Sequence, residues 1–201
     1  MQIANCGLRI ERRDALAVSA AARLLLAALA LALPGCAGDL PPDVAELGYV
    51  NRDQRFALDV PAGWTVREMT GTTPVILSGP ESAGAGRPNI NVTIVPSWDG
   101  MTLEDLVQSS RKGLARLPGY RLDCEGEAAA PYGRAYWPAG SHRAWTATFE
   151  ESSSGRTVRQ RQLYVVAGGR GYIATAASLP EGFAAQEPNF DACFRSFRAG
   201  W

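Results

Sequence analysis

The sequence is poor in the residues on which most catalytic and metal sites depend. Among 201 residues it has one histidine, His142, and four cysteines. The neighbouring Ser141 is unsuited to a Ser-His-Asp site, because adjacent side chains on a strand point to opposite faces. A single histidine and separated cysteines also leave no zinc-ligand spacing. We therefore predict a protein that is not an enzyme and that holds no metal and no cofactor.

The sequence also lacks an apolar run long enough to span a membrane. The apolar segment Leu24 to Leu33 has only ten residues, whereas a spanning helix needs about 20. Arg23 limits the segment on one side and Pro34 on the other. The stretch from Arg9 to Arg23 before it is positively charged. This order is typical of a secretory signal peptide, and an uncleaved anchor is the alternative.

The residues Leu33-Pro34-Gly35-Cys36 follow this run and resemble the lipobox of bacterial lipoproteins. Leu33 and Gly35 match the box, whereas Pro34 is unusual at its middle position. The resemblance implies cleavage before Cys36, a diacylglycerol on its sulfur and an acyl chain on its nitrogen. Two or three chains hold a protein stably at a membrane. A plain signal peptide with a free cysteine near its cleavage site is the alternative.

The residue after the modified cysteine bears on the destination of such a lipoprotein. In this class an aspartate directly after the cysteine favours the inner membrane, but here Ala37 follows. The resemblance therefore implies the outer membrane, with the protein facing the periplasm. We expect a signal peptide over residues 1–35, a lipidated tether over 36–47 stiffened by Pro41-Pro42, and one folded domain over 48–201.

Two cysteines remain after Cys6 leaves with the signal peptide and Cys36 takes up lipid. Cys124 and Cys193 form an even pair in an oxidising compartment, and we expect a disulfide between them. Two unrelated buried thiols are the alternative.

Neither sign of charge dominates the mature chain. The signal peptide accounts for four of the twenty basic and two of the twenty acidic residues, which leaves sixteen and eighteen. A net charge of about −2 gives no electrostatic surface for nucleic acid. The expected partners are the membrane, through the lipid anchor, and an envelope protein.

Hydrophobic periodicity predicts many strands and two helices. Alternation with period two indicates strands, expected at 55–60, 65–69, 74–78, 89–98, 120–127, 133–137, 142–150, 159–166 and 172–177. Helical spacing predicts a helix over 103–117, preceded by Thr102 and Asp105 in a near capping box. A shorter helix is expected over 189–198. This order describes an α+β domain built on an antiparallel sheet.

Five segments in this order resemble a known family. They are FALDVPAGW (56–64), NINVTIVP (89–96), TLEDLVQSSRKGL (102–114), GYIATAAS (171–178) and FDACFRSF (190–197). Together they resemble the PsbP-like/DcrB-like superfamily over residues 50–198. The resemblance implies an antiparallel β-sheet sandwiched between helices, and mostly non-enzymatic members without catalytic residues to carry over.

Acidic residues recur along one predicted strand. Asp123, Glu125 and Glu127 occupy every second position, which predicts three carboxylates on one strand face. A solvated sheet face is favoured over a weak calcium site.

Aromatic residues are the remaining candidates for contact with a partner. Trp64 and Trp145 are expected to fill the core, while Trp137, Trp98 and Tyr132 are expected partner contacts. We predict a non-enzymatic protein-binding or assembly module of the envelope. The alternative is a carrier of a small hydrophobic ligand in a pocket between sheet and helix.

Overall fold

The structure, a computed structural model, describes residues 40–82, 86–96, 98, 100–128, 133–135 and 144–201. By its internal contacts the chain divides into the units Met1–Asp39 and Leu40–Trp201, and the second unit is described here. Within the described residues, no helix has the length and apolar character needed to cross a membrane.

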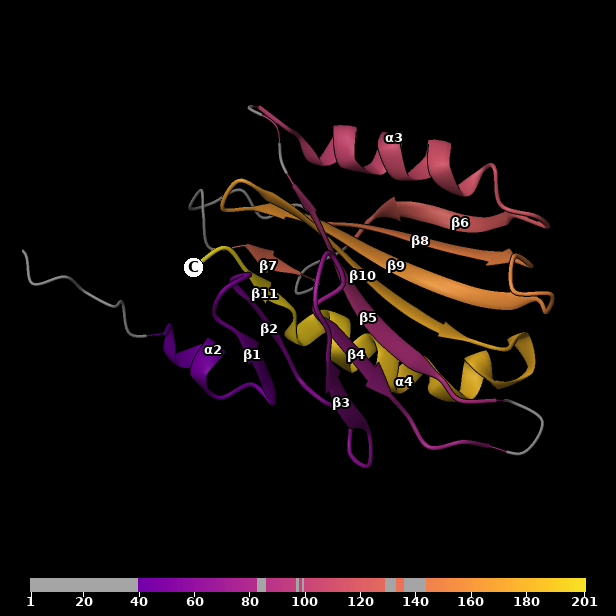
Figure 1. Cartoon of the computed structure of the whole chain (residues 1–201), viewed down its shortest axis with the longest axis horizontal. Helices are drawn as coiled ribbons and strands as arrows, with labels where there is room; N and C mark the ends of the chain where they lie inside the picture. Colours follow the sequence, from indigo (N-terminus) through magenta and orange to yellow (C-terminus); the bar gives the residue numbers. More distant parts are fainter. Residues whose placement is uncertain (1–39, 83–85, 97, 99, 129–132, 136–143) are drawn as a thin grey trace, which may run out of the picture. The chain divides into compact units, whose positions relative to one another are not determined.

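A seven-stranded antiparallel sheet forms the centre of this unit (Figure 1). In spatial order its strands are β3 (Thr65–Glu68), β4 (Val75–Ser78), β5 (Asn89–Pro96), β10 (Arg170–Ser178), β9 (Val158–Ala167), β8 (Ala144–Glu151) and β6 (Arg121–Glu127). A four-stranded sheet contains β1 (Tyr49–Asn51), β2 (Phe56–Leu58), β11 (Arg198–Ala199) and β7 (Arg134–Ala135). Strands β11 and β7 are parallel to each other.

Helices cover both faces of the large sheet. Helix α3 (Leu103–Leu114) packs Leu106 against Tyr164 of β9 on one face. Helix α4 (Pro180–Ser196) packs Phe194 with Leu163 of β9 in the core on the other face. Adjacent strand residues point to opposite faces, so α3 and α4 lie on opposite sides of the sheet, as Figure 1 shows. The predicted α+β fold, an antiparallel β-sheet sandwiched between helices, is confirmed.

Helix α4 is longer than the segment predicted over 189–198. It begins at Pro180 and continues through Pro188. A proline suits the first position of a helix but removes a hydrogen bond in its interior, so the first half of α4 resembles a loop in the sequence. The predicted apolar face is confirmed, because Phe190, Cys193 and Phe194 are fully buried.

Strand β6 contains a β-bulge that separates the three predicted carboxylates. The register shifts between Leu122 and Cys124. Asp123 pairs with Arg159, which lies against α4, whereas Glu125 pairs with Arg111 of α3. The prediction of one shared face is wrong, because the bulge adds a residue to the strand. Among the described residues, no three histidine, cysteine or acidic side chains could together hold a metal ion.

A short helix, α2 (Pro42–Ala45), belongs to the folded unit and not to the tether expected over 36–47. Val44 is fully buried, and Arg198 Nε donates to Asp43 Oδ2 at 3.2 Å. The folded unit therefore begins at Leu40, before the predicted boundary at residue 48. Leu40, Val44 and Leu47 recur at helical intervals, but Pro41 and Pro42 favour an extended tether in the sequence.

Candidate functional site

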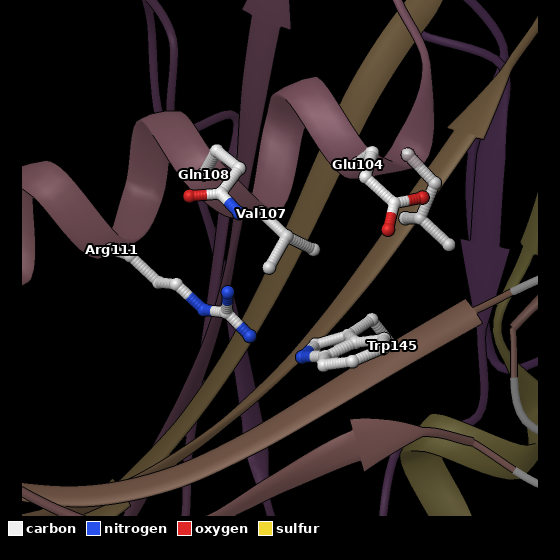
Figure 2. A pocket seen from close by; sticks show the side chains of 6 residues that line it. Glu104, Val107, Gln108, Arg111 and Trp145 are labelled. Atoms are coloured by element: carbon white, nitrogen blue, oxygen red, sulfur yellow. The ribbon is translucent and has the colours of Figure 1, made fainter.

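The candidate site is a small pocket between α3 and β8, drawn in Figure 2. Its volume is about 50 Å³. Six residues line it, namely Leu103, Glu104, Val107, Gln108 and Arg111 from α3 and Trp145 from β8. The volume admits one small chemical group and not a drug-sized ligand, which needs about 300 Å³ or more.

Helical spacing brings the α3 residues to one flank of the helix. Glu104, Gln108 and Arg111 follow one another at intervals of four and three residues, so they are neighbours on the helix surface. Trp145 reaches the pocket because it points to the α3 face of β8, as Ala147 does two residues later. The pocket thus depends on residues that are distant in the sequence.

A fixed positive charge lies beside the indole. Arg111 donates to both carboxylate oxygens of Glu125, with Nε···Oε2 at 2.9 Å and Nη2···Oε1 at 2.6 Å. Such a bidentate pair fixes the plane of the guanidinium. The central carbon of that guanidinium lies 5.5 Å from the centroid of the Trp145 ring, within the range of a cation–π contact.

The indole N–H of Trp145 has no hydrogen-bond partner among the described residues, although its nitrogen is buried. Figure 2 shows the nitrogen-bearing edge of the ring turned toward Arg111, which is itself a donor. A buried donor without an acceptor costs about 1–3 kcal/mol. Neither of the acceptor side chains that line the pocket, Glu104 and Gln108, accepts this hydrogen bond.

A chain of hydrogen bonds beside the pocket fastens α3 to the sheet. Ser110 Oγ lies 3.0 Å from the hydroxyl of Tyr164, which donates to the side-chain oxygen of Gln162. Gln162 Nε2 in turn donates to Thr175 Oγ1 at 3.2 Å. Burial raises the pKa of Tyr164 to about 12, so its phenol stays neutral near pH 7 and does not act as a base.

The structure does not form the expected disulfide. Cys124 and Cys193 are both free thiols, the first exposed and the second buried. Cys124 lies on the edge strand β6, whereas Cys193 lies on α4 with its Sγ 3.1 Å from the carbonyl oxygen of Asp59. An even count of cysteines says nothing of their separation in space, so the count alone could not establish the pairing.

The aromatic residues divide between core and surface. Trp64 is 8% exposed and packs edge-on against Phe190, as predicted for a core residue. Trp98 is 52% exposed. Trp145 was expected in the core but is only partly buried at the wall of the pocket, because it lies near the start of β8, where α3 does not cover it fully. The other predicted positions, Cys36, Tyr132, Trp137, Ser141 and His142, lie outside the described residues.

Two further hollows lie near the start of α4. Their volumes are about 160 and 250 Å³, and Ser178 lines both. Neither these two nor the pocket at α3 reaches the volume of about 300 Å³ that a small-molecule site requires. None of the three therefore supports the alternative prediction of a hydrophobic ligand carrier.

No family model matches the sequence, and no curated protein matches it. Solved structures match the fold. CyanoP, the PsbP of Synechocystis sp. PCC 6803, has a TM-score of 0.55 at 12% identity over 75% of this chain and 90% of its own. LpqN, which is involved in cell envelope biogenesis of Mycobacterium tuberculosis, has a TM-score of 0.52 at 16% identity, over 73% and 83%. The Ran-binding protein Mog1p of Saccharomyces cerevisiae has a TM-score of 0.50 at 12% identity, over 75% and 93%.

These likenesses place the chain in a structural class. It shares the α+β fold of the PsbP and Mog1 structures, which confirms the fold expected from the PsbP-like resemblance. Because fold alone does not define function, the function has to be argued from the pocket.

Proposed function

We propose that this protein is an envelope lipoprotein, held at the outer membrane by lipid on Cys36, whose domain binds another protein and catalyses no reaction. The observation that carries the binding function is the buried, unpartnered N–H of Trp145 at the α3 pocket. The fold likeness to LpqN, a protein involved in cell envelope biogenesis, supports the envelope as the place of action.

The pocket suits a hydrogen-bond acceptor on a small side chain of a partner. Leu103 and Val107 contribute apolar walls, and Trp145 contributes a donor. An asparagine, glutamine or carboxylate side chain of a partner fits a volume of about 50 Å³, and its oxygen would accept the indole N–H. We expect the exposed side chain of Gln108 to turn aside as the partner enters. Tryptophans that become buried on binding contribute much of the binding free energy at many protein interfaces.

The polar groups around the pocket support binding over catalysis. Arg111 is occupied by Glu125, and the phenol of Tyr164 is neutral because burial raises its pKa to about 12. The phenol of Tyr164 is therefore not set to exchange a proton with a substrate near pH 7.

Site-specific photocrosslinking in cells tests the proposed contact. A crosslinking amino acid at Gln108, which lines the pocket, should capture a defined envelope protein. The same residue at Ser109, which is exposed on the other flank of α3, should not. Replacing Trp145 by phenylalanine keeps an aromatic side chain but removes the N–H, and it should reduce the Gln108 crosslink several-fold. Equal crosslinking at both positions, or none at either, would contradict the proposal.

The anchor has its own test. The intact mass of protein extracted from membranes should correspond to a chain that starts at Cys36 and carries added acyl mass. A Cys36→Ala variant should leave the membrane fraction. An unmodified mature chain would overturn the anchor and leave the binding site untouched.

A further inference from the structure

Several chain segments meet at one end of the large sheet. Strand β10 begins there at Arg170, which is paired with Pro96 at the end of β5. Arg170 Nη1 donates to the carbonyl oxygen of Asp53 at 2.9 Å. The backbone N–H of Gly200 donates to the carbonyl oxygen of Arg55 at 2.8 Å. The turn between β1 and β2 and the C-terminal residues are therefore close to this end, which we name the Trp98 end.

The surface at the Trp98 end has the chemistry of a lipid interface. Trp98 follows β5 by two residues and is 52% exposed. Arg52 and Arg55, in the turn between β1 and β2, are exposed as well. Tryptophan is enriched at the head-group level of a bilayer, and arginine is among the residues found at lipid surfaces.

The described unit begins at Leu40, on the same side. Four residue steps separate Cys36 from Leu40, which span at most about 14 Å. Leu40 leads into α2, which is held by the contact of Asp43 with Arg198. Figure 1 places α2, the turn between β9 and β10 and the C-terminus on one side of the domain, at the left of the view. A lipid on Cys36 would thus keep this side close to the bilayer.

We infer that the Trp98 end rests on the lipid surface, with the Trp98 ring at the level of the head groups; the inference depends on the proposed anchor at Cys36. We assign this contact to the anchor and to the apolar ring at position 98 and not to charge, so the orientation should form on uncharged lipid and persist in high salt. The opposite end of the sheet then points into the periplasm.

Fluorescence quenching on vesicles tests the orientation. The lipidated protein is incorporated into phosphatidylcholine vesicles that contain brominated lipid, and bimane is attached at Trp98→Cys in a Cys124→Ser background. The matched control is Leu122→Cys, because Leu122 is also an exposed apolar residue, at 41%. Leu122 lies at the other end of the sheet. It pairs with Phe149, which pairs with Gln160, and Gln160 pairs with Ala177 near the end of β10. Cys193 is buried and does not take the label.

We expect quenching at position 98 to be at least threefold stronger than at position 122. The ratio should not change in 0.5 M salt, where the Debye length is about 4 Å. Equal quenching at the two positions, or none at 98, would overturn the orientation. Crosslinking of position 98 to a protein without quenching by lipid would also overturn it and would assign Trp98 to a protein partner. Failure of the protein to float with the vesicles would count against the anchor itself, so the two proposals fail separately.

Discussion

Burial gives the two cysteines of the described domain different chemistry. Cys193 is fully buried, its Sγ donates to the carbonyl of Asp59 at 3.1 Å, and burial raises the pKa of its thiol to about 12. Cys124 is exposed on β6. Only the thiolate attacks an alkylating agent, and access is needed as well. The two residues should therefore report folding through their reactivity.

We predict that iodoacetamide at pH 8 modifies Cys124 in the native protein and modifies Cys193 only in denaturant. The expectation follows from the exposure of the first thiol and the burial and raised pKa of the second. Mass spectrometry of the two tryptic peptides, without prior reduction, measures the modification at each site. Protection of both cysteines until a reductant is added would instead indicate a disulfide.

At the scale of elements, helix α3 shows how local sequence sets a boundary. The N–H of Asp105 donates to Thr102 Oγ1 at 3.1 Å, and the N–H of Thr102 donates to Asp105 Oδ2 at 2.9 Å. Hydrogen bonds from the Thr102 side chain and backbone lower the pKa of Asp105, because they favour its ionised form. The predicted capping box is thus complete, and the helix begins where the sequence places it.

Replacing Thr102 by alanine should lower the free energy of unfolding by about 1 kcal/mol, because the cap loses its acceptor. Urea unfolding followed by circular dichroism measures the change. Ser109→Ala is the matched control, since Ser109 is exposed within the same helix, and it should change stability by less than about 0.5 kcal/mol. Equal effects of the two variants would show that the cap contributes nothing.

Arg161 of β9 forms two ion pairs with helix α4. Arg161 donates to Glu187 at 2.6 Å and to Asp191 at 2.7 Å, and its guanidinium lies 5.7 Å from the ring centroid of Phe183. Its side chain is only 20% exposed. Arg87 and Glu81, by contrast, are 3.6 Å apart with side chains 57% and 73% exposed.

We predict that Arg161→Gln destabilises the protein by about 1–3 kcal/mol, because a partly buried site loses its charge-assisted hydrogen bonds. Arg87→Gln should cost less than about 1 kcal/mol, as is usual for an exposed pair. Denaturant midpoints of both variants give the comparison. The interpretation fails if the two losses are equal.

Periodicity was sufficient to predict the elements whose burial repeats regularly. In β5, Ile90, Val92 and Ile94 are buried and the residues between them are half-buried, which is the alternation seen in the sequence. The N-terminal half of α4 escaped prediction because Pro188 is tolerated there by packing that only the whole fold supplies. The bulge in β6 also escaped prediction, because one additional residue leaves the alternation of residue types in the sequence unchanged.

The candidate site could be predicted only in part. The sequence placed Trp145 on a strand and Arg111 on a helix, but their approach depends on how α3 crosses β8. The unpartnered indole N–H is a property of that crossing, because it is defined by which polar atoms come near it. No spacing rule in the sequence contains this information.

At the scale of the whole molecule, the sheet separates two cores that each contain groups able to lose a proton in alkali. The core under α4 contains Cys193, Tyr172 and Tyr49, and the core under α3 contains Tyr164. Burial raises the pKa values of Tyr172 and Tyr49. It raises those of Cys193 and Tyr164 to about 12, from ordinary values of 9.0 for the thiol and 10.0 for the phenol. Both groups stay protonated in the folded state at a pH where the unfolded chain releases its protons.

Stability should therefore fall in alkali in two steps. Below about pH 9 both states hold both protons, and these groups add no pH dependence. From about pH 9 the unfolded state loses the thiol proton, and the free energy of unfolding falls by up to about 1.4 kcal/mol per pH unit. From about pH 10 the phenol adds a similar slope, and both slopes end near pH 12, where the folded state also ionises. Urea midpoints at pH 8, 9.5, 10.5 and 11.5 measure the curve for the parent, Cys193→Ala and Tyr164→Phe. Removal of the Cys193 thiol should abolish the slope that begins near pH 9. Removal of the Tyr164 phenol should reduce the slope that begins near pH 10, to which Tyr172 and Tyr49 also contribute. Unchanged slopes in both variants would show that burial keeps neither Cys193 nor Tyr164 protonated.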